Sequence, residues 1–320
     1  MFPSELRAFH AVAQSGSIRK ASELLEIAPS SVSRKVALLE HHIGTTLLDR
    51  TSGGVKLTHA GSLVAEYARS VVLDYDSLRA DLNDWRGSRR KLIRVEAVES
   101  IVSGGLMEAV AAFRVKYDAV SFRLTVVPAP QVVDDVRRGD CELGVTFCCP
   151  SQPDIVTVAS IPEPIMLVVP NSHPLAAAKT VTLKDLDGRS LALPDVTFGV
   201  RRIFDRAAQE AGLAATLSPV FSSNIFEALR EFVRCGSGIA ILPYRAVLRE
   251  SSRNFLKAVP IEHPALSEAT IDVITLRKHH PARIVTNFID QLLQTFQTTA
   301  ATNAVRRPLA SGEVAHYAAP

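Results

Sequence analysis

The clearest pattern of apolar and polar positions near the N-terminus runs from residue 16 to residue 40. Its first half has an apolar face at helical spacing, made of Ile18, Ala21, Leu24 and Leu25. Ser17 stands just before this face, where its hydroxyl can cap the helix. A second helix is predicted from Pro29, because proline suits the first helical position. The buried stripe of this second helix is Val32, Val36 and Leu39.

Opposite its buried stripe, the second helix offers a short polar and cationic face made of Ser30, Ser31, Ser33, Arg34 and Lys35. Hydroxyl and cationic donors at the N-terminal end of a helix can contact DNA phosphates and base edges. Two helices joined by a short turn, the second with such a face, are typical of a helix-turn-helix. Two amphipathic helices of an ordinary helical protein are the alternative.

A Gly-Gly pair at residues 53–54 lies between two short extended runs, which predicts a small hairpin, or wing. Arg50 and Lys56 would flank its tip and contact DNA phosphates. Thr58 then stands where it can cap a further long helix. Residues 1–60 are therefore predicted to form a winged helix-turn-helix DNA-binding domain.

Residues 58–87 carry one long helical pattern with apolar residues three and four positions apart. This stripe consists of Leu63, Val64, Tyr67, Val71, Val72, Tyr75, Leu78 and Leu82. Long helices between domains usually bury such a stripe against a partner, and a helix-turn-helix on a two-fold operator needs a second copy. We therefore expect residues 58–87 to be a linker and dimerisation helix, with a helix packed inside one domain as the alternative. A polar hinge is expected at residues 87–91.

From Leu92 onward, strand-like apolar runs alternate with helical runs, which predicts an α/β architecture of parallel sheets covered by helices on both faces. Strands are expected at 92–97, 121–127, 142–147, 155–160, 165–169, 190–193, 217–221, 239–242 and 270–276. Helices are expected at 103–117, 131–138, 199–212, 224–235 and 281–297.

This region, residues 92–297, is longer than one small domain and is predicted to divide in two. Subdomain I would comprise residues 92–162 and 268–297, and subdomain II residues 163–267. Two chain crossings between them would create a hinged cleft, as in periplasmic binding proteins. The stretch 298–320 is rich in Ala, Thr and Pro without periodicity and is expected to be a disordered tail.

Composition limits the function classes. The chain has 320 residues, 47% of them hydrophobic, and a net charge of only +3. DNA binding must then come from a local cationic face and not from the overall charge. Because we find no apolar run of bilayer length and no signal-type N-terminus, we expect a cytoplasmic chain with no membrane partner.

The order of the N-terminal elements resembles that of LysR-type transcriptional regulators. The matching residues are Leu6, Phe9, Gly16-Ser17, Ala21, Leu25, Pro29-Ser30, Val32-Ser33, Val36, Leu39-Glu40, Gly44, Leu47-Leu48-Asp49-Arg50, Leu57-Thr58 and Ala60-Gly61. The resemblance implies a homodimer or homotetramer that binds double-stranded DNA at an interrupted palindromic operator. It also implies a small-molecule effector in the C-terminal cleft, and it makes RNA polymerase a further candidate partner.

Ligands of open α/β sheets bind beyond the carboxyl ends of the strands. The expected effector-binding residues on these loops are Val98, Glu99, Ser100, Gln131, Thr146, Thr197, Phe198 and Asn224. For the polar ones, ordinary helix capping is the alternative. Glu99, with Glu96 in the strand before it, favours a cationic or zwitterionic effector over a simple carboxylate. Arg94 is the alternative partner for Glu96.

Catalytic patterns are missing from the sequence. We find no G-x-S-x-G, no P-loop and no G-x-G-x-x-G, and the nine histidines are scattered. We therefore expect no enzyme activity, no cofactor and no metal site. The four cysteines, Cys141, Cys148, Cys149 and Cys235, leave a thiol-based redox-sensing regulator as an alternative. A cleft enzyme or solute-binding protein with a dimerisation module is the other.

Overall fold

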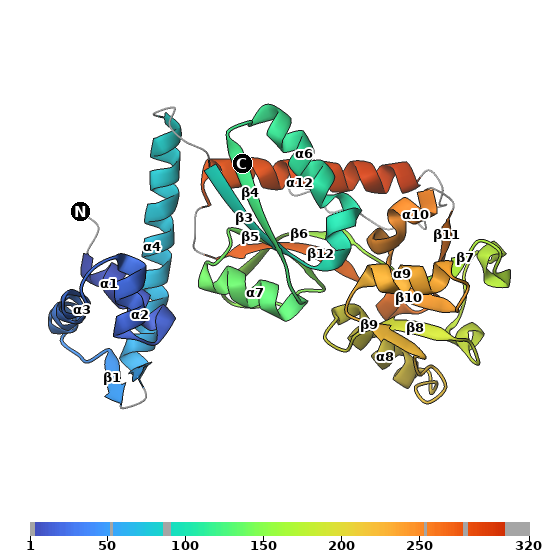
Figure 1. The fold of residues 1–320 in the computed structure, drawn as a ribbon, viewed down its shortest axis with the longest axis horizontal. Coiled ribbons are helices and arrows are strands. Elements are labelled where there is room, and N and C mark those ends of the chain that lie inside the picture. Colours follow the sequence, from blue (N-terminus) through green and yellow to red (C-terminus); the bar gives the residue numbers. More distant parts are fainter. Residues whose placement is uncertain (1–3, 52–53, 86–90, 253–254, 278–280, 305–320) are drawn as a thin grey trace.

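The computed structural model describes residues 4–51, 54–85, 91–252, 255–277 and 281–304. A small helical domain at the N-terminus is followed by one long helix and then by two α/β units (Figure 1). The N-terminal elements are α1 (Ser4–Ser15), α2 (Ile18–Leu25), α3 (Pro29–Ile43), β1 (Leu48–Thr51), β2 (Gly54–Leu57) and α4 (His59–Trp85). The expected architecture, a winged helix-turn-helix and linker helix before a two-part α/β effector domain, is confirmed.

The N-terminal domain is organised around the buried faces of α1, α2 and α3. Phe9, Val12, Val32 and Val36 have no exposed surface. The Ser17 hydroxyl accepts the Lys20 N–H at 3.4 Å, and Pro29 occupies the first turn of α3, so both predicted helix starts are confirmed.

Leu24 was expected on the buried face of α2, but its side chain is exposed. The buried face is centred between Ala21 and Leu25. At about 100° per residue, Leu24 points about 80°, or nearly a quarter of a turn, away from that centre.

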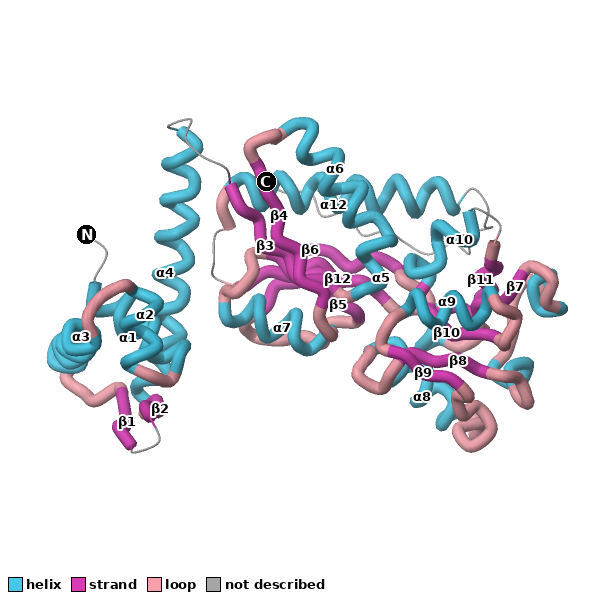
Figure 2. Tube along the Cα trace, viewed as in Figure 1, coloured by secondary structure: helices cyan, strands magenta, loops and turns pink. Residues whose placement is uncertain are grey.

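The first sheet of the effector domain has the strand order β4-β3-β5-β12-β6. In Figure 2 its strands lie between α12 above and α7 below. Its strands are β3 (Lys91–Ala97), β4 (Val120–Val126), β5 (Leu143–Phe147), β6 (Ile155–Pro162) and β12 (Thr270–Leu276). β3 pairs with β4 and β5 in parallel, whereas β12 pairs with β5 and β6 in antiparallel fashion. The sheet is therefore mixed, not parallel as expected, because β12 joins it from the far end of the chain and runs opposite to its neighbours β5 and β6.

The second sheet has the order β11-β7-β10-β8-β9 and is also mixed. Its strands are β7 (Ile165–Pro170), β8 (Leu191–Pro194), β9 (Phe221–Ser223), β10 (Ile239–Pro243) and β11 (Leu256–Pro260). The strand expected at 217–221 was wrong in extent, since Pro219 cannot donate to a ladder and the strand begins only at Phe221. The edge strand β11 was missed because its short alternating run includes an exposed lysine, Lys257.

Helices cover both faces of the first sheet. They and the remaining helices of the domain are α5 (Glu99–Ile101), η1 (Val102–Leu106), α6 (Met107–Lys116), α7 (Ala129–Arg138), α8 (Gly199–Glu210), α9 (Phe226–Arg234), α10 (Leu248–Ser252), α11 (Pro264–Ser267) and α12 (Arg283–Ala304). Short 3₁₀ turns are η2 (Pro174–Ala177), η3 (Leu183–Leu186) and η4 (Tyr244–Val247).

The close packing of α7 and α12 is visible at single residues. Gly144 of β5 has no room for a β-carbon, which would lie 2.7 Å from Val136 of α7. On α12, Phe288 packs edge-on against Phe113 of α6 with ring centroids 5.3 Å apart. α12 continues to Ala304, beyond the expected end at residue 297. Residues 305–320 of the expected tail and 87–90 of the expected hinge lie outside the described residues, and Lys91 already begins β3.

None of the helices in the described ranges is both long and apolar enough to traverse a bilayer.

Candidate DNA-binding and effector-binding sites

The N-terminal part of α3 presents the predicted polar face. Ser30 and Arg34 are exposed, and Ser31 and Ser33 are partly exposed. Within the described residues, no hydrogen bond or ion pair engages the Arg34 guanidinium. Lys35 differs from the prediction of an outward side chain, because its Nζ donates to the Ser4 hydroxyl of α1 at 2.7 Å. The Arg34 side chain, in contrast, is exposed.

The wing is held by a contact that sequence reasoning missed. Glu40 of α3 accepts hydrogen bonds from the backbone N–H groups of Leu47 and Leu48, at 2.7 and 3.1 Å. The match of Glu40 to the LysR pattern was the signal that could have identified it. Lys56 is exposed in β2, while Arg50 is described only by its backbone pairing with Val55.

The start of α4 packs against residues 46–47, next to the wing. Thr58 accepts the Gly61 N–H at 2.9 Å, as predicted for a capping residue, and donates to the Thr46 carbonyl. A β-carbon on Gly61 would lie 2.0 Å from the Leu47 carbonyl oxygen, so only glycine fits this approach.

Further along α4, much of the predicted stripe is uncovered. The exposed members are Leu63, Tyr67, Tyr75, Leu78 and Leu82, with Leu63 and Tyr67 exposing 60% and 65% of their surface. Val64 and Val71 instead pack on the N-terminal core. The helix therefore leaves the apolar side chains of Leu63, Tyr67, Leu78 and Leu82 exposed along one face.

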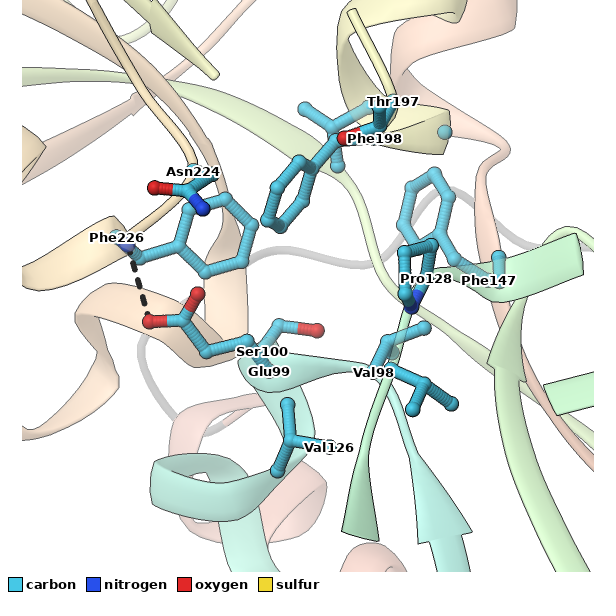
Figure 3. Close-up of a pocket in the computed structure, with 14 residues that line it drawn as sticks. Val98, Glu99, Ser100, Val126, Pro128, Phe147, Thr197, Phe198, Asn224 and Phe226 are labelled. Carbon is cyan, nitrogen blue, oxygen red and sulfur yellow. Dashed lines mark hydrogen bonds between the residues drawn. The ribbon is translucent and has the colours of Figure 1, made fainter. Parts of the chain in front are cut away.

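A pocket of about 210 Å³ lies between the two α/β units, at the carboxyl ends of the strands (Figure 3). It is lined by Val98, Glu99, Ser100, Val126, Val127, Pro128, Ala129, Phe147, Thr197, Phe198, Gly199, Val200, Asn224 and Phe226. Six of the eight residues predicted for effector binding belong to this lining.

Gln131 and Thr146 are the two that do not. Gln131 is exposed on α7, beyond the pocket. Thr146 is buried, and its hydroxyl donates to the Ala129 carbonyl at 3.3 Å, which ties β5 to the start of α7. Besides the predicted Val98 and Phe198, the pocket has further apolar walls that sequence reasoning missed, among them Phe147 and Phe226, because it looked mainly for polar groups at the strand ends.

Glu99 links the two sides of the pocket. Its Oε1 accepts the backbone N–H of Phe226 at 3.0 Å, so a carboxylate from the first unit caps α9 of the second. Burial raises the pKa of the Glu99 carboxyl, while the Phe226 hydrogen bond and the Arg230 charge act in the opposite direction. On the opposite wall, the Thr197 hydroxyl and N–H both bond to Asp195, which lowers the pKa of that carboxyl.

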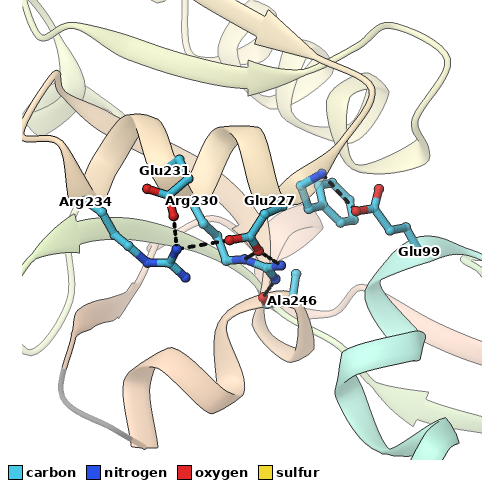
Figure 4. A network of polar contacts seen from close by, with 7 residues as sticks. Glu99, Glu227, Arg230, Glu231, Arg234 and Ala246 are labelled. Carbon is cyan, nitrogen blue, oxygen red and sulfur yellow. Dashed lines mark hydrogen bonds and ion pairs between the residues drawn. The ribbon is translucent and has the colours of Figure 1, made fainter.

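Two arginines near the pocket, Arg201 and Arg230, are paired with other groups. Arg201 of α8 pairs with Asp205 at 2.8 Å and donates to the Pro194 carbonyl. Arg230 of α9 binds Glu227 and the Ala246 carbonyl, within a network that extends to Glu231 and Arg234 (Figure 4).

The suggested pairing of Arg94 with Glu96 is wrong. Arg94 instead binds Glu142 through its N–H at 2.7 Å and its Nε at 3.0 Å. The Oε2 atom of Glu96 is buried and has no hydrogen-bond partner within the described chain. Burial, and the nearby charge of Asp140, raise the pKa of Glu96.

All four cysteines are free thiols. Burial raises the pKa of Cys141 to about 12, and it also raises the pKa of Cys148 and Cys149. Cys235 is exposed. Because thiolates are the reactive species, these shifts disfavour redox chemistry at the first three cysteines. Among the described residues, no group of three His, Cys, Asp or Glu side chains could hold a metal ion.

Two family models match this chain. One, described as a bacterial regulatory helix-turn-helix protein of the lysR family, matches residues 3–62. The other, described as the LysR substrate binding domain, matches residues 86–297. The chain belongs to the LysR family of transcriptional regulators. As a LysR-type regulator, it combines an N-terminal DNA-binding domain with a C-terminal effector-binding domain.

Known proteins agree with this assignment. The transcriptional dual regulator GltC of Bacillus subtilis is 27% identical over 293 residues, which cover 91% of this chain and 96% of that protein. A full-length OxyR variant from Pseudomonas aeruginosa superposes with a TM-score of 0.65 at 19% identity, covering 93% of this chain and 95% of that one. Full-length CbnR in complex with its target DNA gives a TM-score of 0.51 at 21% identity, covering 92% and 100%. The two solved structures share the fold.

Proposed function

We propose that this LysR-type regulator recognises an interrupted palindromic operator through Ser30, Ser31, Ser33 and Arg34 of α3. The observation that carries the proposal is the exposed Arg34 guanidinium on the first turns of α3, which has no partner among the described residues. An arginine there can contact a guanine edge in the major groove. Arg50 and Lys56 of the wing would contact phosphates, and Lys35 would hold α1 in place.

In this proposal the pocket between the α/β units binds the small-molecule effector, and α4 pairs with a second copy to form a dimer. Two dimers would form a tetramer on DNA, and the solved CbnR complex with target DNA supports DNA binding by this fold. RNA polymerase is the further partner we assign to the DNA-bound form. We assign the protein to the cytoplasm and give it no enzyme activity, since its named relatives are transcriptional regulators.

The replacement Arg34→Ala tests the DNA contact. Loss of a base contact should weaken specific operator binding by about 1–3 kcal/mol, that is, by roughly 5- to 150-fold. The measurement is a fluorescence anisotropy titration with the intergenic fragment beside the gene that encodes the protein, against a scrambled duplex of equal length. Arg114→Ala, which removes an exposed arginine from α6 of the effector domain, serves as the charge-matched control.

We expect Arg114→Ala to bind the operator as the wild type does. Lys56→Ala should weaken operator and scrambled duplex alike, because phosphate contacts carry no sequence information. Unchanged operator affinity in Arg34→Ala would refute the assignment of α3 as the reading element.

A further inference from the structure

We propose that the effector is a molecule with an apolar body about the size of one aromatic ring and a single protonated amine, and that its ammonium group binds beside Glu99. The inference rests on the proposed effector-binding function and deepens it. It follows from the walls of the pocket, from the charge of its lining and from the pairing of the arginines around it.

The walls favour an apolar body. Most of the lining is aliphatic or aromatic, including Phe147, Phe198 and Phe226, and the rings of Phe198 and Phe226 are 5.0 Å apart. The volume of about 210 Å³ exceeds that of cavities of about 150 Å³ that accept one benzene ring. A single ring with a short arm therefore fits, and the phenylalanine faces can also attract a cation.

The charge of the lining is negative. Among the described residues that line the pocket, Glu99 is the charged one. Its Oε1 is engaged by the Phe226 N–H, whereas its other oxygen points toward Asn224 and the pocket interior (Figure 3). Within the described chain, no hydrogen bond reaches that second oxygen. The Arg230 charge and the Phe226 hydrogen bond only partly offset the burial of the Glu99 carboxylate, so its pKa remains raised. A ligand ammonium beside the second oxygen would offset the remaining cost of burial.

A carboxylate ligand would meet no matching cation among the described residues of the lining. Arg201 already forms an ion pair with Asp205, and Arg230 with Glu227. Arg202 is exposed near the rim, where its Nη2 would lie 3.9 Å from a β-carbon on Gly199. A ligand that carries a carboxylate can therefore place this group near Arg202 at the rim. It still needs an ammonium group to pair with Glu99 inside the pocket.

Simple amines and amino acids share this chemistry, since both carry an ammonium group. In an amino acid, the carboxylate would face the N-terminus of α8, whose first N–H groups have no side-chain cap. The two sources are distinguished by comparing ligands that share one body.

The experiment is isothermal titration calorimetry on the full-length protein with 2-phenylethylamine, phenylalanine and 3-phenylpropionate. We expect one or both amines to bind at least about tenfold more tightly than 3-phenylpropionate, because a charge-assisted hydrogen bond contributes about that much. Tighter binding of phenylalanine than of 2-phenylethylamine would identify the amino-acid class, and the reverse order the simple amines. Matched series with isobutyl and indolyl bodies cover other apolar shapes.

Glu99→Gln supplies the residue-level test. The glutamine amide oxygen can still accept the Phe226 N–H, so the change removes the charge and keeps the cap of α9. Amine affinity should fall by about tenfold, while the affinity of 3-phenylpropionate stays equal or rises. Glu210→Gln, an exposed glutamate at the other end of α8, is the matched control and should bind as the wild type does.

The proposal is overturned if 3-phenylpropionate binds more tightly than both amines, if no amine of the three series binds, or if Glu99→Gln retains amine affinity. Operator binding is measured on the same preparations. Failure to bind operator would count against the proposed function itself, whereas intact operator binding with a carboxylate preference would remove only the amine class.

Discussion

Glu163 and Arg245 form a buried ion pair where the chain crosses between the two α/β units. The Arg245 Nε lies 2.9 Å from Glu163 Oε2, and its backbone N–H donates to Oε1 at 2.8 Å. The guanidinium also donates to the Gly104 carbonyl and lies 4.7 Å from the centre of the Phe296 ring. Gly104 and Phe296 belong to the first α/β unit and Arg245 to the second. Arg245 therefore connects the two units through these contacts.

The protonation of Glu163 should make the stability of the protein depend on pH. Burial raises the pKa of this carboxyl to about 7 from 4.5, against the opposing charge of Arg245. Between these values the folded chain retains a proton that the unfolded chain has released, so the contribution to stability falls as pH rises. From about pH 5 to about pH 8, the wild type should lose about 2–3 kcal/mol of unfolding free energy relative to Glu163→Gln.

Urea unfolding of both proteins at the two pH values measures this difference. Glutamine cannot titrate, so subtracting its curve removes the contributions of all other groups. A difference that grows in favour of the wild type as pH rises would mean that the ion pair outweighs burial and holds the carboxyl ionised.

At the scale of elements, the wing depends on two neighbouring helices for its orientation. Glu40 of α3 binds the N–H groups of Leu47 and Leu48, and Gly61 of α4 lies against the Leu47 carbonyl. Both leucine side chains are buried, and the two hydrogen bonds to Glu40 are partly buried. The wing is therefore placed by the helix that is proposed to read DNA.

Glu40→Ala should destabilise the N-terminal domain by about 1–3 kcal/mol, because two partly buried donors lose their acceptor. Operator affinity should fall as well, since the wing is no longer held beside α3. Glu40→Gln is the control, because its amide oxygen can accept the same bonds. Thermal unfolding and the operator titration together measure both effects; a Glu40→Gln variant as unstable as Glu40→Ala would show that charge, and not the two hydrogen bonds, matters.

At the scale of the whole molecule, the exposed face of α4 predicts self-association. Leu63, Tyr67, Leu78 and Leu82 form an apolar row along one side of a helix of 27 residues. Exposed apolar patches of this kind mark protein interfaces. A second copy of the same helix is the partner that a two-fold operator requires.

Leu78→Glu should convert the proposed tetramer or dimer into smaller species, because it places a charge inside the apolar contact. Analytical ultracentrifugation at micromolar concentration measures the mass. Leu24→Glu, at an exposed leucine of α2 outside the row, should leave the mass unchanged. A wild-type protein that sediments as a monomer would contradict the proposed assembly.

The sequence by itself determined the features that depend on near neighbours in the chain. Ser17, Pro29 and Thr58 mark helix starts because caps act within one turn, and the Gly-Gly pair marks the wing for the same local reason. Most strands of the effector domain were also predicted, since a buried strand appears in the sequence as a run of apolar residues whichever strands it pairs with. The positions of six pocket residues followed from the rule that ligands bind at strand ends.

Only the tertiary structure decided which distant residues meet. Glu99 and Phe226 are 127 positions apart in the sequence. Arg94 pairs with Glu142 and not with Glu96 because β3 lies parallel to β5 in the sheet. Lys35 contacts Ser4 because α3 packs against α1, and this packing cannot be predicted from the residues near either one in the sequence. The physical reason is common to all three: side-chain pairing is set by packing between elements, whereas helix and strand patterns record only which face of each element is buried.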